Sequence, residues 1–230
     1  DVRHSVSDPV FDARVNIMGF LNILENAVKH GGRRVIFASS GGAIYGEQEI
    51  FPAPETHVKS PLSPYGVSKL AGENYLFYYH AVHGLSYVAL RYANVYGPRQ
   101  DPYGEAGVVA IFVQKMLKGE QPIINGNGMQ TRDYIYVGDL VEAHMAAIET
   151  TVNDDLNVGT GKETSVNELY SLIREITGAS LAAIHGPAKP GEQKRSCLNS
   201  ERIRRVLEWE PGTSLHQGLR ETVNYFRNKV

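Results

Sequence analysis

The hydrophobic positions of this chain follow two patterns, one typical of helices and the other of buried strands. Residues 9–30 carry apolar side chains over a broad helical face and are followed by Gly31-Gly32, which predicts a buried helix that ends there. Residues 33–40 and 85–92 are short, nearly continuous apolar runs. Runs of this kind are typical of parallel strands that are covered on both faces.

The same two patterns alternate along the rest of the chain. A helix is predicted at 65–83, after a proline-rich loop. The later segments are strands at 122–125, 132–137 and 156–161, and helices at 108–118, 138–149, 165–177, 200–207 and 215–226. This alternation predicts an α/β fold with parallel strands and right-handed crossovers. Residues 94–107 are predicted to form a long loop of the kind that carries function.

Composition and charge narrow the class of protein. The 230 residues are 42% hydrophobic and 21% charged, as is usual for a globular protein. The net charge of −2 argues against nucleic acid or an anionic membrane as a partner. The single cysteine, Cys197, cannot form an internal disulfide, and no apolar run reaches about 18 residues. We therefore predict a cytoplasmic protein, and the eight histidines, which lack ligand spacing, predict no metal site.

Candidate chemistry begins at Tyr65 and Lys69, which stand four residues apart and share one face of the predicted helix. An ammonium beside a phenol favours the phenolate and lowers a pKa that is normally about 10. Such a phenol can act as a base near neutral pH. The spacing alone is weak evidence, because Tyr225 and Lys229 share it.

Polar residues at the ends of two predicted strands distinguish the first pair. Ser39 and Ser40 end the first strand, and Asn94 follows the second. Ligands of open α/β sheets bind at the carboxyl ends of the strands, so these side chains and Tyr65 are predicted to meet there. The alternative interpretation is that the serines only end a strand and that the lysine is solvated.

Several motifs then stand in a fixed order: SSGGAIYG, SPLSPYGVSKLAGE, LRYANVYGPRQ, GEAGVVAIF, GNGMQTRDYIYVGDL, NVGTG and KPGEQKRS. Together they resemble the extended short-chain dehydrogenase/reductase family, and within it the NAD-dependent UDP-hexose 4-epimerases. The resemblance implies a Rossmann-type, doubly wound parallel sheet that binds NAD and a smaller C-terminal α/β lobe that holds the UDP-sugar. Residues 1–96 with roughly 134–160 would form the first part, and residues 97–133 with roughly 161–230 the second.

The resemblance also assigns roles at the cofactor. Tyr65 would be the catalytic base, and Lys69 would lower its pKa and hold the nicotinamide ribose. Ser40 would hydrogen-bond the sugar 4-hydroxyl, with Ser39 as second choice, because SSGGAIYG has one residue more than the commoner arrangement. The residues expected at the cofactor are Asn16, Ser39, Tyr65, Lys69, Tyr92 and Ala93, the last in place of a commoner phenylalanine.

Other positions match residues that hold the substrate. Arg132 and Arg195 would bind the diphosphate, for which a planar guanidinium is well suited. The free N–H groups at the start of the helix 108–118 would assist them, and Glu192 would bind a ribose hydroxyl. Lys189 and Asn199 replace a commoner arginine and aspartate, which weakens individual contacts. The set expected at the substrate is Ser40, Asn94, Val108, Val109, Arg132, Glu192, Arg195 and Ser196.

The glycine-rich turn that binds the NAD pyrophosphate in this family does not occur in these residues. The acidic residue that normally follows it about 20 positions later is also absent. We therefore expect this chain to be part of a longer protein that has about 60 further residues, or two βα units, at its N-terminal side. Alone, it is expected to bind NAD poorly.

The implied reaction is NAD-dependent 4-epimerisation of UDP-glucose and UDP-galactose through a 4-keto sugar. Ser196 stands where the family has a residue that gates the pocket near the sugar C2 substituent. A small residue there is expected to admit UDP-GlcNAc and UDP-GalNAc as well.

Two alternatives remain for the function. One is another sugar-nucleotide enzyme of this fold, a dehydratase, decarboxylase or reductase. The dehydratases and decarboxylases carry acidic residues after the strand-end hydroxyl, where this chain has Gly41-Gly42. The other is a non-catalytic NAD-sensing protein, which the intact tyrosine, lysine and serine disfavour.

Many relatives form dimers by pairing two long helices. A homodimer through residues 9–30 and 65–83 is therefore expected, and the aromatic run YLFYY is consistent with a buried face there.

Overall fold

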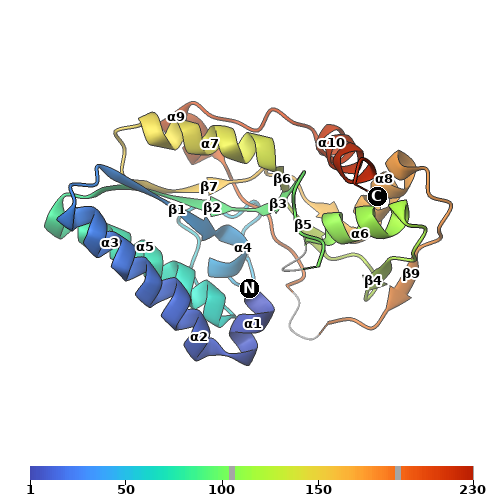
Figure 1. The fold of residues 1–230 in the computed structure, drawn as a ribbon, viewed down its shortest axis with the longest axis horizontal. Helices are drawn as coiled ribbons and strands as arrows, with labels where there is room; N and C mark the ends of the chain where they lie inside the picture. Colours follow the sequence, from blue (N-terminus) through green and yellow to red (C-terminus); the bar gives the residue numbers. More distant parts are fainter. Residues whose placement is uncertain (104–106, 190–192, 230) are drawn as a thin grey trace.

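Three parallel strands form the central sheet (Figure 1). The computed structural model describes residues 1–103, 107–189 and 193–229. In the order in which they pair, the strands are β1 (Arg34–Ser40), β2 (Ser86–Tyr92) and β7 (Asp154–Val158). Ser40 pairs in register with Tyr92, and Tyr92 with Val158, so the carboxyl ends lie side by side. The predicted parallel sheet is confirmed, and β2 is buried as predicted, whereas most residues of β1 are only half-buried.

Helices cover both faces of this sheet, which explains the continuous apolar runs. On one face lies α5 (Pro64–His83), and on the other α7 (Val137–Glu149) and α9 (Glu201–Leu207) (Figure 1). Along β2, Tyr87 and Ala89 pack with Leu76 of α5. Val88 and Leu90 pack instead with residues of α7, including Leu140.

The N-terminal helical segment packs beside α5 and is longer and less regular than its sequence predicts. It consists of α2 (Pro9–Ala13), a π-helical segment (Arg14–Met18) and α3 (Gly19–Lys29), preceded by the short helix α1 (Val2–Ser7). The Asp8 carboxylate caps its start by accepting from the Phe11 N–H at 2.9 Å. The predicted helix at 9–30 is thus confirmed, but the wider turns in its middle were not predicted.

A second core lies beside the sheet (Figure 1). Its helices are α6 (Val108–Leu117), α8 (Val166–Thr177) and α10 (Leu215–Arg227), which bury Val113, Leu169 and Val223 among them. Three small sheets border it. They pair β3 (Asn94–Tyr96) with β6 (Tyr134–Tyr136), β4 (Ile123–Asn125) with β9 (Ile184–Gly186), and β5 (Thr131–Arg132) with β8 (Thr164–Ser165).

Two predicted segments differ from the structure. The predicted loop 94–107 begins with the strand β3. The predicted strand 132–137 is divided at Asp133, whose carboxylate turns inward and accepts backbone N–H groups from Thr160, Gly161 and Leu198. The chain changes its pairing partner at this residue, from β8 before it to β3 after it.

Two glycines let the elements around the end of β1 approach closely. The short helix α4 (Gly41–Ile44) follows β1 directly. A Cβ on Gly41 would lie 2.6 Å from the Leu198 side chain, and one on Gly66 would lie 2.6 Å from the Ala43 carbonyl oxygen. Without side chains at these positions, α4 contacts the first turn of α5 beside the end of β1.

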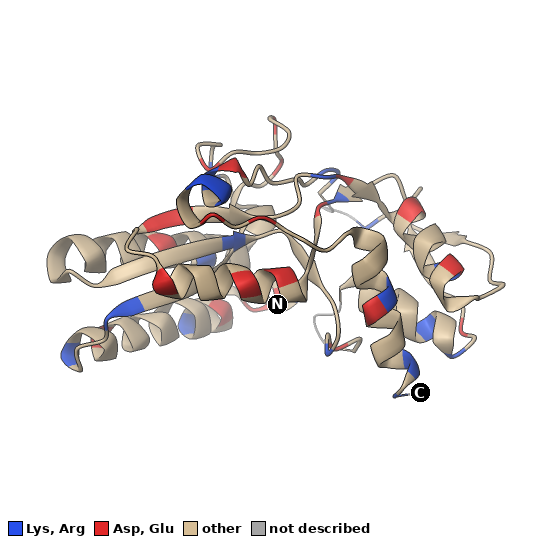
Figure 2. Ribbon diagram, turned by 90° about the horizontal axis from the view of Figure 1, so that it is seen from above, with Lys and Arg blue, Asp and Glu red and all other residues tan. Residues whose placement is uncertain are grey.

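In the described part of the chain, lysines and arginines occur together with aspartates and glutamates on the elements of both cores (Figure 2). Across the described part of the chain, no helix combines the length and the apolar character needed to cross a bilayer.

Candidate active site

The predicted tyrosine–lysine pair lies at the start of α5, against the end of β1. Ser63 caps this helix by accepting the Gly66 N–H at 3.1 Å, and Pro64 occupies its first turn. The Lys69 Nζ donates to the Ala38 carbonyl at 2.9 Å and lies 5.5 Å from the centroid of the Tyr65 ring. A cation held at this distance favours a phenolate over a phenol.

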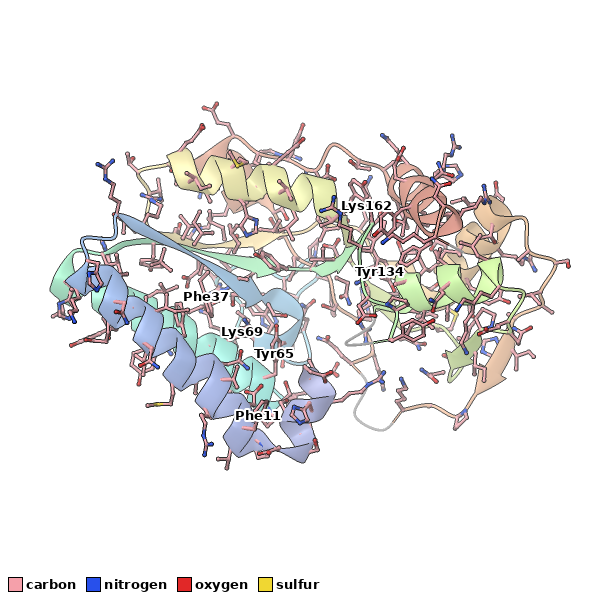
Figure 3. All side chains as sticks on the ribbon, in the orientation of Figure 1. Phe11, Phe37, Tyr65, Lys69, Tyr134 and Lys162 are labelled. Carbon is pink, nitrogen blue, oxygen red and sulfur yellow. The ribbon has the colours of Figure 1, made fainter. Side chains whose placement is uncertain are left out.

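Phe37 completes the surroundings of this lysine. The Lys69 Nζ lies 5.0 Å from the centroid of the Phe37 ring, so the ammonium contacts two aromatic rings as well as one carbonyl. Figure 3 shows Phe37, Lys69 and Tyr65 next to one another beneath the sheet. The lysine is therefore held at the strand end, although its bond to Ala38 is exposed to solvent.

The two serines at the end of β1 have different surroundings. Ser39 is 2% exposed, and its hydroxyl donates to Glu73 Oε1 at 2.6 Å, inside the molecule. Ser40 is the last residue of β1 and is half-buried. Successive side chains of a strand point to opposite faces, so the two hydroxyls cannot serve the same ligand equally. This arrangement favours Ser40 as the serine that meets a substrate.

Tyr92 and Ala93 lie beside this position, at the end of β2. The Tyr92 hydroxyl is 2.7 Å from Nε2 of His144, whose Nδ1 lies 2.9 Å from the Leu140 carbonyl. Because only an N–H can pair with that carbonyl, Nδ1 carries the proton and Nε2 accepts from the tyrosine. Burial is the main cause that raises the pKa of Tyr92, and the negative charge of a Tyr65 phenolate raises it further, which indicates that the two phenols are neighbours.

Asn16 and Asn94, which the sequence also predicts at the site, belong to two other elements of the fold. Asn16 belongs to the π-helical segment, and its Nδ2 donates to Asp12 Oδ1 at 2.8 Å. The other oxygen of Asp12 accepts from Ser68 on α5 at 2.7 Å, so the asparagine is oriented by a carboxylate that is fixed to α5. Asn94 begins β3 and is exposed, and its backbone N–H donates to the Asp133 carbonyl at 2.8 Å.

These residues fit the nicotinamide end of NAD. Tyr65 and Lys69 offer a hydroxyl and an ammonium at the end of β1, while Ala93 and the Tyr92 ring are partly buried in the apolar cluster behind it. A planar aromatic group and a ribose need such a wall and such donors. Among the described residues, no group of three or more histidines, cysteines or acids is arranged to hold a metal ion.

The residues predicted at the substrate come from the second core and from its junction with the sheet. Val108 and Val109 start α6, but the Val109 side chain is buried in the second core, so only its backbone can face a ligand. Arg132 lies on β5, and its Nη1 donates to the Thr131 carbonyl at 2.8 Å. Glu192 lies outside the described residues.

Arg195 is already engaged by two residues that the sequence interpretation missed. Its guanidinium forms a bidentate pair with Glu163, with an Nε–Oε1 distance of 2.9 Å, and lies 3.7 Å from the centroid of the Phe51 ring. The hydrogen bonds from Arg195 lower the pKa of Glu163. Arg195 is thus held as an oriented, half-exposed cation, a suitable partner for an anion.

Ser196, the next residue, is 3% exposed and lies behind α4. A Cβ on Gly42 would come within 3.5 Å of the Ser196 Oγ. The predicted gate residue is therefore packed against α4, which directly follows Ser40.

The chain segment that carries Arg195 and Ser196 is joined to the loop after α4 by backbone hydrogen bonds. The Ala53 N–H donates to the Cys197 carbonyl at 2.9 Å, and the Asn199 N–H donates to the Ala53 carbonyl at 2.9 Å. The Gln48 side chain accepts the Cys197 N–H, also at 2.9 Å. We refer to residues 193–199 and 46–57 together as the junction. It fixes the segment with Arg195 and Ser196, which the sequence predicts at the substrate, against the loop that follows α4.

A buried charged network was also missed by the sequence interpretation. Arg91, in the middle of an apolar strand, is 1% exposed and pairs with Glu73 of α5 and Asp155 of β7. Burial raises the pKa of Asp155 to about 6, and the nearby Glu73 charge adds to this effect. An arginine inside an apolar strand and a glutamate one turn beyond Lys69 were the available signals.

The structure also contains a cavity beside the junction, lined in part by Pro52 and Asn199. Its volume is about 550 Å³, and it lies between Tyr134, the loop 159–164 and residues 210–215. None of the predicted site residues lines it.

Comparison with known proteins agrees with the fold. The chain matches the model of the NAD dependent epimerase/dehydratase family over residues 1–159. It is 49% identical to the UDP-glucose 4-epimerase of Thermotoga maritima, solved with UDP-glucose, with a TM-score of 0.98 over 99% of this chain and 74% of that one. A UDP-glucose 4-epimerase of Thermus thermophilus, solved with NAD, is 43% identical over 100% of this chain and 75% of that one, with a TM-score of 0.94.

A third similar structure is the UDP-N-acetylglucosamine 4-epimerase of Methanobrevibacter ruminantium M1, in complex with UDP-N-acetylmuramic acid. It is 34% identical over 100% of this chain and 74% of that one, with a TM-score of 0.96. The fold, together with Tyr65 and Lys69 beside the end of β1, is thus that of a Rossmann-type α/β protein that binds a nucleotide cofactor. The chain belongs to the NAD dependent epimerase/dehydratase family, and the resemblance noted in the sequence is confirmed.

Proposed function

We propose that this chain carries the catalytic site of an NAD-dependent UDP-hexose 4-epimerase. The observation that carries the proposal is the position of Lys69, whose Nζ joins the Ala38 carbonyl at the end of β1 to the ring of Tyr65. Similarity to UDP-glucose 4-epimerases at 43–49% identity supports the same reaction. Gly41-Gly42 after Ser40 supply no acid or base, which is unfavourable for an elimination of water.

In this proposal Tyr65 accepts the proton of the sugar 4-hydroxyl and returns it after the keto sugar has turned in the pocket. Lys69 keeps a positive charge beside the phenolate, and Ser40 hydrogen-bonds the sugar oxygen. When bound, NAD supplies reversible acceptance of the sugar C4 hydride. The proton that leaves the substrate comes back to it, so the site needs no outside proton donor.

The UDP part of the substrate is proposed to lie along the second core. Arg132 and the oriented Arg195 supply cations for the diphosphate, and the first N–H groups of α6, at Val108 and Val109, supply further donors. Asn94 and Glu192 are proposed to contact the rest of the nucleotide sugar. The division into residues 1–96 with about 134–160 and residues 97–133 with about 161–230 remains our proposal, supported by the two separate apolar cores.

Ser196 leads us to propose a broad sugar range. Its small side chain is packed against Gly42, beside the end of β1. UDP-GlcNAc and UDP-GalNAc are therefore proposed as substrates beside UDP-glucose and UDP-galactose. The similarity to a UDP-N-acetylglucosamine 4-epimerase supports this range.

A homodimer and a cytoplasmic location complete the proposal. The N-terminal helical segment and α5 expose many large apolar side chains, among them Val10, Phe11, Val15, Met18, Ile23, Val67, Phe77, Tyr78 and Val82. A groove of about 520 Å³ between these helices is lined mainly by Pro9, Ile17, Leu62 and Val67. Apolar patches of this extent usually mark an interface, and two copies of this surface would cover each other.

The proposal is tested with Tyr65→Phe and the matched variant Tyr225→Phe. Turnover of UDP-galactose is measured with added NAD in the protein that contains this chain. Removing the base is expected to lower kcat by at least about 10³-fold, while UDP binding stays within about threefold. Tyr225→Phe is expected to leave both unchanged. Full activity of Tyr65→Phe would end the proposal.

A further inference from the structure

The catalytic helix carries a third polar residue in line with the tyrosine and the lysine. Tyr65, Lys69 and Glu73 follow one another at intervals of four residues and therefore lie on the same side of α5. Unlike the other two, Glu73 is fully inside the molecule, with 4% of its surface exposed. A buried carboxylate is costly unless charged or polar partners surround it, so its partners show what it does.

The first partner is the strand that carries the serines. The Ser39 hydroxyl donates to Glu73 Oε1 at 2.6 Å, and one turn earlier Lys69 donates to the Ala38 carbonyl at 2.9 Å. Two successive turns of α5 are thus bonded to two successive residues of β1. These links fix both the rotation of the helix and its position along the strand, directly before Ser40.

The second partner is the neighbouring strand. Arg91 Nε donates to Glu73 Oε1 at 2.9 Å, and Arg91 Nη2 donates to Glu73 Oε2 at 2.7 Å. Arg91 is the register partner of Ser39 and directly precedes Tyr92. A bidentate pair fixes the plane of the guanidinium relative to that of the carboxylate. The Glu73 carboxylate therefore orients α5 against both β1 and β2, whose ends form the site.

The remaining donors of the guanidinium are also satisfied. Its Nη1 lies 3.1 Å from the Tyr45 hydroxyl, which donates to Asn157 Oδ1 at 2.8 Å, and its Nη2 lies 2.7 Å from Asp155 Oδ2. Arg91 is therefore held from several sides and does not move with the helix. Buried ion pairs often give no more stability than apolar side chains of similar size, so stability is an insufficient explanation for this one.

We propose that the Glu73–Arg91 pair is a positioning device for the reaction: it holds the Tyr65–Lys69 face of α5 at a fixed rotation and height against Ser40 and Tyr92. The pair does not touch the substrate. It acts through the place of the phenol and the ammonium. This inference rests on the proposed epimerase function, because it concerns the residues that the reaction uses.

The experiment compares two carboxylates that bind the same guanidinium. Glu73→Gln removes the charge that comes from the catalytic helix, while Asp155→Asn removes the charge that comes from β7. Because displacement of a reacting group by about 1 Å can cost about 10²-fold in rate, Glu73→Gln is expected to lower kcat for UDP-galactose by about 10- to 100-fold with KM within about threefold. In Glu73→Gln, the acid limb of the kcat–pH profile is expected to move to higher pH than in the parent protein. Asp155→Asn is expected to stay within about threefold in both constants.

A paired apolar variant, Glu73→Leu with Arg91→Met, separates positioning from folding. It removes both charges of the pair and is made together with Asp155→Asn, so that no carboxylate is left facing the lost guanidinium. The proposal expects a folded protein, by thermal unfolding, with the same loss of kcat and the same shift of the pH profile. If this variant folds and keeps the kcat and the pH profile of the parent protein, the positioning proposal is overturned. If Glu73→Gln does not fold, the paired variant alone decides.

A second readout does not depend on turnover. The ionisation of Tyr65 is followed by ultraviolet absorbance, as the difference between each protein and its Tyr65→Phe derivative. A lower pKa of Tyr65 in the parent than in the paired variant supports the positioning, and equal values contradict it. Absence of epimerase activity in the parent protein with NAD would refute the proposed function. The titration would still decide whether the Glu73–Arg91 pair influences the pKa of Tyr65.

Discussion

The two tyrosine–lysine pairs of this chain have the same spacing and opposite surroundings. In the pair on α10 and just after it, the Lys229 Nζ lies 4.7 Å from the centroid of the Tyr225 ring, which is closer than the 5.5 Å between Lys69 and Tyr65. Distance alone would therefore select the wrong pair. The difference is that Lys69 also bonds to the Ala38 carbonyl at a strand end, next to Ser40. A phenol and an ammonium become a candidate base only where a sheet delivers further polar groups.

The largest difference between the two pairs is expected on removal of the cation. Lys69→Met should lower kcat with UDP-galactose by about 10²- to 10⁴-fold, because the phenolate loses its stabilising charge. Lys229→Met should stay within about twofold. Equal losses in both variants, measured as steady-state rates at saturating NAD, would show that the surroundings described here do not matter.

Ser39 and Ser40 allow a similar comparison of two neighbouring residues of one strand with different surroundings. Ser40→Ala is expected to reduce kcat by about 10²-fold through loss of a hydrogen bond to the reacting oxygen. Ser39→Ala is expected to act on stability, since Glu73 loses a buried donor, at a cost of about 1–3 kcal/mol. Chemical denaturation and turnover are measured on both. The reverse assignment of the two effects would make Ser39 the substrate serine.

The junction tests whether the second core sets the sugar range. Ser196→Tyr places a large ring beside Gly42 and is expected to lower kcat/KM for UDP-GlcNAc and UDP-GalNAc about tenfold more than for UDP-glucose and UDP-galactose. Ser171→Tyr, on the exposed side of α8, is the control and should change neither ratio. An equal loss on both pairs of sugars would count against the gate.

The helices on the two faces of the sheet give the next comparison, which tests the proposed dimer interface. Phe77→Asp, on exposed α5, is expected to convert a dimer to a monomer in sedimentation velocity, because a charge would be buried in the apolar contact. Met145→Asp, on exposed α7, is the control and should leave the mass unchanged. A parent protein that sediments as a monomer at all concentrations would contradict the proposed interface.

The smallest effect is expected at Asp155. Its pKa, raised by burial to about 6, exceeds the ordinary value of the unfolded chain, so folding takes up a proton between about pH 4 and 6. The contribution is present at low pH and is lost as the pH rises through about 6. The unfolding free energy of the parent minus that of Asp155→Asn should therefore be larger at about pH 4.5 than at about pH 7.5. A difference that does not change with pH would mean that Asp155 is charged throughout.

Much of the fold could be predicted because its elements have local causes. β2 reads as a continuous apolar run because helices cover both faces, and α5 carries its own cap and first-turn proline. Tyr65 and Lys69 follow from the same helix, since residues four apart share a face. The π-helical turns at Arg14–Met18 had no such local signal.

The missed residues depend on contacts between distant parts of the chain. Glu163 meets Arg195 from 32 positions away, and Asp155 meets Arg91 from 64. A carboxylate in a loop or at a strand looks like a solvated charge in the sequence, because nothing nearby shows which cation faces it. Only the packing of strands against helix and loop brings such pairs together.

The junction also gives the molecule a built-in chemical reporter. Cys197 is the only cysteine of the chain, is 1% exposed, and sits where the second core joins the sheet. Burial raises the pKa of its thiol to about 12, so in the closed arrangement it is both shielded and unreactive toward electrophiles. Labelling by a maleimide must then wait for the junction to separate. The rate of labelling, measured with and without a UDP-sugar, reports how often the junction separates and how strongly a ligand opposes that separation.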